Sequence, residues 1–308
     1  MAWKLFGSKK PAGETATRLA DGVRQTILRS LGIHSIPMMP QAAQQAFQLA
    51  TNPNAEAHDY IEVIEADEGL SARVLKIANS VFYDRGGGSR TIADAVNVVG
   101  ISELRGLLNA TALANVFPLR HPMRRQLWAH DVATAITARL LSRSLLPSCT
   151  DQAFLAGLMH DIGKLLLLQR HTDTYDKLVK RGIADGIESI KAEALEYPFD
   201  HTEVGHLIGE RWNFSADLIN VISNHHQSWD KVPQQSLTAI VKASNIVTHV
   251  LGLTGANDSP AMRRIYEPLL PEAWDFLGVS SSLQRSLSEE VRTCFDREFE
   301  LFSSWGSG

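Results

Sequence analysis

Apolar residues recur at three- and four-residue steps along most of this chain, and this periodicity limits the fold more than any other sequence feature. The clearest runs cover residues 41–50, 59–80, 91–99, 102–113, 126–146, 151–169, 172–181, 187–196, 200–212, 215–226 and 235–251. Such steps gather apolar side chains on one face of an α-helix, whereas a half-buried strand alternates residue by residue. The sequence contains no convincing alternating stretch, so we predict an all-α protein, a multi-helix bundle.

Residues that start and end helices agree with this prediction. We expect Gly69 to separate two short helices and the glycines at 86–88 to form a loop, because successive glycines cannot repay their ordering entropy inside a helix. Asp151, Asp200 and Ser215 each precede an apolar run and carry a side chain that can satisfy free helix amides. We therefore expect these three residues to cap helices.

The 308 residues are enough for about two domains, or one elaborate domain, with a core that needs no metal or disulfide to support it. Pro118 and Pro122 bracket the expected junction. We predict four segments: a basic flexible N-terminal segment (1–29), an N-terminal helical subdomain (30–120), a histidine-bearing helical subdomain (121–255) and a C-terminal extension (256–308).

Charge and cysteine content restrict the partners and the compartment. The formal charge is −4, which argues against broad nucleic-acid binding because that requires a basic footprint. Residues 1–30 carry +4, and we interpret them as a solvated basic tail, with an anionic partner or membrane surface as the alternative. Only Cys149 and Cys294 are present, and no apolar run reaches the length of a membrane span. We expect a cytoplasmic protein with no integral membrane segment.

Five of the eleven histidines lie at positions that favour a shared site: His130, His160, His201, His225 and His226. One histidine on an apolar helix face is usually a core residue with a single hydrogen bond. Five such residues, each able to face the interior of the bundle, make a common site the better interpretation.

The segment from Gly157 to Lys164, GLMHDIGK, is the densest chemical signal. It places the His160 imidazole beside the Asp161 carboxylate, a pair that can bind one metal ion or bridge two in a helical bundle. Lys164 follows His160 by one turn and could contact a phosphate or a metal-bound anion, or could simply balance the nearby acid. We predict His160 and Asp161 as the centre of any metal site.

This segment resembles the His-Asp motif of the HD phosphohydrolase superfamily. The order of the five histidines with Asp161 and Lys164 is similar to that of the HD-GYP branch. Two features depart from that branch: Asn245 stands where a closing aspartate is expected, and residues 227–233 lack the Gly-Tyr-Pro signature. The resemblance therefore implies no turnover of cyclic di-GMP.

The first half of the chain is similar to a closer relative, the HDOD domain. Three stretches carry the resemblance, Ile36–Pro40, Ile64–Ser80 and Thr91–Gly100, and with the histidine region it extends over about residues 30–250. The resemblance implies an all-α module of bacterial signalling that acts through protein contacts. We interpret Asp67, Asn79 and Ser80 within it as structural, because such side chains commonly cap helix ends.

Two functions remain open at this stage. The first is a regulatory module that contacts signalling proteins and whose degenerate pocket is structural or binds a metal or a small phosphorylated ligand. The second is a metal-dependent phosphohydrolase or phosphodiesterase acting on a nucleotide or another phosphoester. In the enzyme, His130, His160, Asp161, His201, His225 and His226 would hold one or two ions of Fe, Mn, Zn, Ni or Mg, with Asp161 and Lys164 in catalytic roles.

Overall fold

The structure, a computed structural model, is helical in every regular element that it describes, which confirms the all-α prediction. It describes residues 18–32, 36–39, 41–51, 55–80, 83, 86–101, 104–106, 108, 110, 116–117, 120–253 and 260–303. The expected helix at 102–113 lies mostly outside these ranges. The domain boundaries stay predictions.

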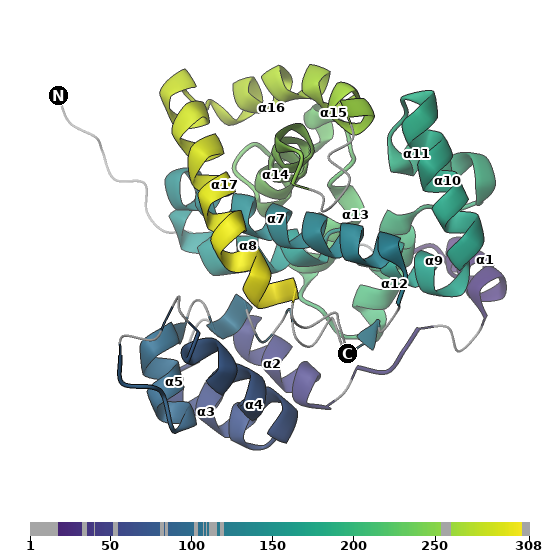
Figure 1. The fold of residues 1–308 in the computed structure, drawn as a ribbon. Helices are drawn as coiled ribbons and strands as arrows, with labels where there is room; N and C mark the ends of the chain where they lie inside the picture. The colour runs from purple at the N-terminus through teal and green to yellow at the C-terminus, as the bar shows by residue number, and fades with distance from the viewer. Residues whose placement is uncertain are drawn as a thin grey trace, which may run out of the picture.

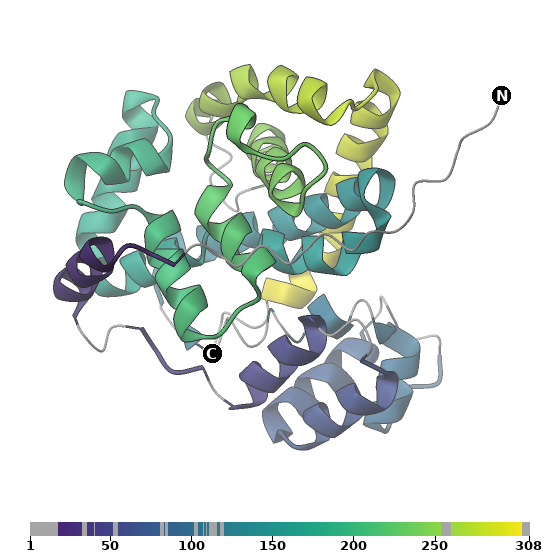
Figure 2. The ribbon, with the colours of Figure 1, turned by 180° about the vertical axis from the view of Figure 1, so that it is seen from behind.

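The helices fall into two neighbouring groups that both views show (Figures 1 and 2). The N-terminal group contains α2 (Gln41–Thr51), α3 (Ala57–Glu65), α4 (Glu68–Ala78) and α5 (Ile92–Val99). The larger group contains α7 (Pro122–Leu145), α8 (Thr150–Met159), α9 (Ile162–Arg170), α10 (Thr172–Asp185), α11 (Ser189–Glu196), α12 (His201–Arg211), α13 (Ala216–Asn224) and α14 (Leu237–Leu251). Helix α1 (Asp21–Leu31) packs against α12.

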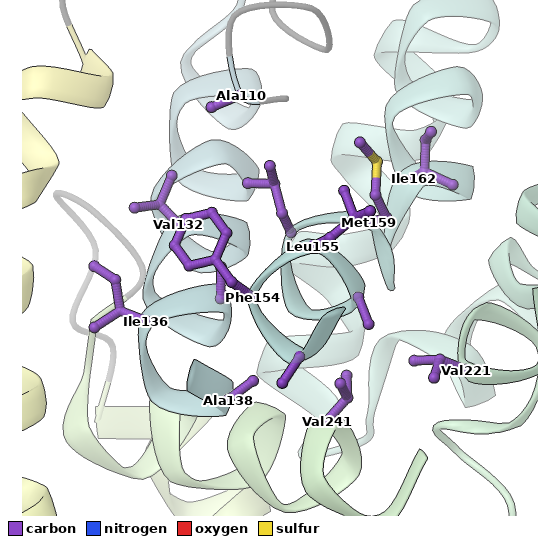
Figure 3. Close-up of a cluster of buried hydrophobic side chains, with 14 of the residues drawn as sticks. Ala110, Val132, Ile136, Ala138, Phe154, Leu155, Met159, Ile162, Val221 and Val241 are labelled. Atoms are coloured by element: carbon purple, nitrogen blue, oxygen red, sulfur yellow. The ribbon is translucent and has the colours of Figure 1, made fainter. Parts of the chain in front are cut away.

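The long helix α7 is the centre of the larger group and packs against α8, α14 and α17. Figure 3 shows Phe154 of α8 beside Val132 of α7, with Val241 of α14 on the other side of α8. Helices α7 and α8 approach closely at Gly157, where a Cβ atom would lie 2.7 Å from the Cα of Ala135. A glycine is needed there, and it precedes the His-Asp pair by three residues.

The C-terminal extension is also helical and closes over α7 and α14. It consists of α15 (Pro260–Tyr266), α16 (Leu270–Leu277) and α17 (Ser281–Ser303). Arg139 of α7 donates to Glu298 of α17 at 2.7 Å, and both side chains are buried. This ion pair fixes the last helix to the central one.

The expected break at Gly69 is wrong by two residues. Helix α3 ends at Glu65, and Gly69 lies inside α4. Asp67 caps the start of α4, because its Oδ1 accepts a hydrogen bond from the Leu70 amide at 2.8 Å. The side-chain cap thus decides the helix start, and the glycine is tolerated within the first turn.

The caps at Asp200 and Ser215 are confirmed, whereas the one at Asp151 is wrong. Asp200 forms a capping box with Glu203, and Ser215 accepts from the Leu218 amide. Asp151 lies within α8, which begins at Thr150, and its carboxylate pairs with Arg105 at 2.7 Å. An ion pair across the fold has taken the side chain that was expected to cap.

The structural interpretation of Asn79 is confirmed. Its Oδ1 accepts from the Ser89 amide at 2.6 Å, and its Nδ2 donates to the Ser89 carbonyl at 2.9 Å. These two bonds hold the end of α4 against the exit of the 86–88 glycine loop. Among the described residues, no helix combines the length and the apolar character needed to cross a membrane.

Candidate metal centre

His160 and Asp161 lie at a break between two helices, which corrects the prediction of one helix over 151–169. Helix α8 ends at Met159 and α9 begins at Ile162, so His160 is the C-terminal cap of the first and Asp161 the N-terminal cap of the second. On a continuous helix, neighbouring side chains point about 100° apart. The break instead lets the imidazole and the carboxylate face one centre.

The Asp161 carboxylate is the common point of the site, and its two oxygens face different partners. Oδ1 lies 3.3 Å from Nε2 of His201 and 3.4 Å from Nε2 of His225. Oδ2 accepts a hydrogen bond from Nζ of Lys164 at 2.6 Å, and lies 3.4 Å from Nε2 of His160 and 3.7 Å from Nε2 of His130. Asp161 therefore joins two sets of side chains.

Every residue that the sequence predicted as a ligand belongs to at least one of two groups of side chains around Asp161. We call them the His201 group, which is Asp161, His201, His225 and His226, and the His130 group, which is His130, His160 and Asp161. Within each group the ligand atoms lie within 4.8 Å of one another, a spacing that one metal ion can span. The clustering expected from the sequence is thus present, while the metal itself stays a prediction.

Glu193 orients His201, a role that no sequence pattern indicated. Its Oε2 accepts a hydrogen bond from Nδ1 of His201 at 2.7 Å, and its Oε1 accepts one from the Tyr175 hydroxyl at 2.6 Å. Glu193 and Tyr175 are both fully buried. A carboxylate behind a ligating histidine fixes the ring and raises its basicity. The contact joins α11 to α12 in space, so no local pattern could have revealed it.

Backbone carbonyls orient two more histidines. Nδ1 of His160 lies 2.7 Å from the Gly157 carbonyl, and Nδ1 of His225 lies 3.0 Å from the Ile222 carbonyl. Since a carbonyl only accepts, these contacts assign the ring proton to Nδ1 in both residues. Each Nε2 then presents a lone pair toward Asp161, as a metal ligand must.

A glycine allows the His201 side of the site to approach Asp161. A Cβ atom on Gly163 would lie 1.9 Å from the His201 carbonyl oxygen, far inside contact distance. Helices α9 and α12 can therefore pack closely only with glycine at this position. The same contact brings His201, at the start of α12, against the start of α9 where Asp161 lies.

Asn245 and His249 complete the buried surroundings on the side of His130. Both lie on α14 and are at most 5% exposed. The His249 ring stacks on His130 at 4.2 Å between centroids and on Tyr266 at 3.9 Å. His249 follows Asn245 by one helical turn on the same helix face, and that spacing is the signal that sequence reasoning missed.

Burial and the central carboxylate set the protonation states. Burial opposes the charged forms of Asp161 and Lys164, but their mutual attraction outweighs it. Against burial, His160 and then Lys164 lower the pKa of Asp161, and Asp161 and then Glu193 raise the pKa of Lys164. Burial, with a smaller effect of the Lys164 charge, lowers the pKa of His160 and His225, and it lowers the pKa of His130 to about 4. These rings are neutral at physiological pH, which is the form that binds metal.

His201 is the exception. Burial disfavours its imidazolium form, but the Glu193 carboxylate outweighs burial and raises the pKa of His201 to about 9. Its second ring proton is on Nε2, which makes a hydrogen bond to Nε2 of His225 at 3.4 Å and lies 3.3 Å from Oδ1 of Asp161. A metal ion that bound at this position would replace that proton.

The donor set fits a divalent metal ion. Nε2 of His160, Oδ1 of Asp161 and Nε2 of His226 are buried, and none has a hydrogen-bond partner in the part of the chain that the structure describes. Unpaired polar atoms in a protein interior are costly, and a coordinated cation would satisfy these three. Imidazole nitrogens with one carboxylate suit zinc, iron, nickel and manganese ions.

An all-α bundle with a His-Asp pair buried at its centre defines the class of HD-like proteins. The HDOD domain matches residues 36–228, which is more than half of the chain. The chain therefore belongs to the HDOD domain family, as the sequence resemblance indicated.

Solved structures share the fold. A candidate signal transduction protein from Marinobacter aquaeolei VT8 has a TM-score of 0.72 at 23% identity, covering 92% of this chain and 62% of its own. A candidate phosphohydrolase from Shewanella amazonensis SB2B has a TM-score of 0.68 at 22% identity, covering 91% and 98%. An HDOD domain protein of unknown function from Geobacter sulfurreducens has a TM-score of 0.66 at 22% identity, covering 90% and 98%.

One curated relative, an uncharacterized protein from Treponema pallidum (strain Nichols), is 24% identical over 274 residues. The alignment covers 86% of this chain, which spans about half the length of that relative.

Proposed function

We propose that this chain is a regulatory HDOD module of bacterial cytoplasmic signalling, in which the Asp161 centre is a closed structural site for a divalent metal ion. The module acts through contacts with signalling proteins. The resemblance in fold to a candidate signal transduction protein supports this assignment, and the chemistry of the donor set supports the metal.

The burial of the metal centre favours a regulatory role over hydrolysis. His160, Asp161, His201 and His225 are at most 1% exposed. A catalytic metal site keeps an open position at which water or substrate binds, whereas a structural site is closed. A phosphoester cannot reach these four side chains unless the surrounding helices separate.

The absence of a charge at Asn245 also favours a regulatory module over a hydrolase. A neutral amide at the place of the closing aspartate removes an ionised oxygen ligand, the type that hard divalent ions prefer. Fold alone does not transfer an activity, so the phosphohydrolases of similar fold do not make this chain an enzyme.

The alternative is a metal-dependent phosphohydrolase that acts on a nucleotide or another phosphoester. The observation that favours it is the completeness of the remaining donor set, since Asp161 and all five histidines lie at the centre. In that case a bound metal would activate water, Asp161 would hold the metal, and Lys164 would stabilise charge on a phosphoryl group.

Hydrolysis assays on metal-loaded protein separate the two functions. We expect no turnover of phosphomonoesters, phosphodiesters, nucleotides or cyclic di-GMP by the wild type. The matched control is a His160→Ala, Asp161→Ala variant shown to be folded by circular dichroism. Metal-dependent turnover by the wild type that this variant lacks would overturn the proposal, and partner capture that both proteins share would support it.

A further inference from the structure

We infer that the chain binds one metal ion per molecule, in the His201 group, and that the Lys164 ammonium takes the place of a second cation in the His130 group. The inference rests on the proposed metal-binding function and specifies its site and number. Three differences between the two groups support this inference.

The first difference is that Lys164 competes with a metal ion for one oxygen of the Asp161 carboxylate. Nζ of Lys164 donates to Oδ2 of Asp161 at 2.6 Å, and Lys164 is only 5% exposed. Oδ2 is the oxygen that faces His130 and His160. A metal ion on this side would meet a positive charge that water does not screen. On the other side, Oδ1 faces Nε2 of His201 and Nε2 of His225, and both nitrogens can be metal ligands once the His201 ring has lost its second proton.

The second difference is the anchoring of the histidines. In the His201 group, Glu193 fixes His201 and a carbonyl fixes His225. In the His130 group, only His160 is anchored in this way. Among the described residues, His130 makes no hydrogen bond to a backbone carbonyl or a carboxylate, and its polar neighbour is the Asn245 amide. Ligands held in place before binding hold a metal more tightly than ligands that must be ordered by it.

The third difference is the charge around each group. Glu193 adds a buried carboxylate behind His201, so the negative charge of Asp161 is reinforced there. Beside His130 lie the neutral side chains of Asn245 and His249, and Lys164 contacts the carboxylate oxygen on this side. The positive charge of Lys164 also reaches His201, but there Glu193 outweighs it. A divalent cation is therefore favoured in the His201 group and disfavoured in the His130 group.

The test counts manganese ions per chain in protein that has been loaded with Mn²⁺ and freed of excess metal. We expect one ion in the wild type and two in a Lys164→Met, Asn245→Asp variant, which loses the competing cation and gains an ionised oxygen ligand. In the two-metal variant, the electron paramagnetic resonance spectrum should show coupled ions. Lys180→Met is the matched control, because Lys180 is 69% exposed and pairs with Asp176 away from the centre.

Two single variants test the same inference if the double variant does not fold. His226→Gln should lower Mn²⁺ affinity at least tenfold, whereas His130→Gln should leave it within about threefold of the wild type. Two ions in the wild type, one ion in a folded double variant, or metal lost with His130→Gln would each overturn the inference. Two ions in the wild type would leave the proposed function intact, whereas an absence of bound metal would overturn both.

Discussion

The two groups around Asp161 share one carboxylate and the same residue types, yet the protein treats them differently. The His201 group is supported by a buried glutamate and a tyrosine behind it. The His130 group faces a lysine, an asparagine and a stacked histidine. Ligand types alone therefore do not locate a metal ion, because the charge and the anchoring behind the ligands decide which side is occupied.

Gly163→Ala should have the largest effect on the difference between the two groups, because it displaces the whole His201 group. The new Cβ would lie 1.9 Å from the His201 carbonyl oxygen, so α12 must move away from α9. We expect a loss of at least about 3 kcal/mol of stability together with loss of metal binding. Thermal melts and metal titrations measure both.

Gly22→Ala in α1 is the control for this change, since nothing lies within 4 Å of its Cβ position. It should change stability by no more than about 1 kcal/mol, in the stabilising direction. A Gly163→Ala protein as stable as this control, with normal metal content, would show that the close approach of α9 and α12 is not required.

Replacing both His160 and Asp161 with alanine should abolish metal uptake. Asp161 belongs to both groups, and its loss removes the only carboxylate that either group offers as a ligand. Metal analysis of the folded double variant tests this expectation. Unchanged metal content would mean that the centre lies elsewhere.

Glu193→Gln should weaken metal binding by the His201 group and leave the His130 group unchanged. Glutamine keeps the size of the side chain but removes the charge that holds the His201 ring. Loss of such an outer carboxylate typically costs about 10–100-fold in metal affinity. Glu196→Gln, an exposed change on the same helix, should leave the affinity unaltered. Equal affinities for both variants would contradict the assignment of metal to the His201 group.

Metal affinity should rise with pH by up to about tenfold per unit and level off near pH 9. The metal replaces a proton of His201, whose pKa is raised to about 9 by Glu193 against the effect of burial. In the metal-free protein the same shift stabilises the fold fully below pH 6.5, and this contribution is lost as the pH rises through about 9. Titrations between pH 6.5 and 9.5 measure the slope, and a flat profile would place the metal away from His201.

Sequence periodicity was enough to predict the all-α fold and most helices, because an apolar face repeats wherever a helix packs on a core. It failed where tertiary contacts decide local structure. The apolar pattern continues through residues 151–169, but the chain breaks at His160 and Asp161 to aim both side chains at one centre.

The ligand types at the site were also predictable, whereas their division into two groups was not. The five histidines and Asp161 stand out by type and by resemblance to known motifs. Glu193 does not, because an acid on α11 becomes meaningful only when the folded chain brings it to His201, and the only sign of His249 is its one-turn spacing from Asn245. Likewise, the contact of Lys164 with Oδ2 of Asp161 depends on the fold and could not be predicted from the sequence.

Anomalous diffraction from crystals of the Mn²⁺-loaded protein tests the central claim most directly, because it locates the metal without reference to activity. The account predicts one peak per chain, within coordination distance of Oδ1 of Asp161 and of the His201, His225 and His226 rings. A peak between His130, His160 and Asn245, or two peaks bridged by Asp161, would contradict it.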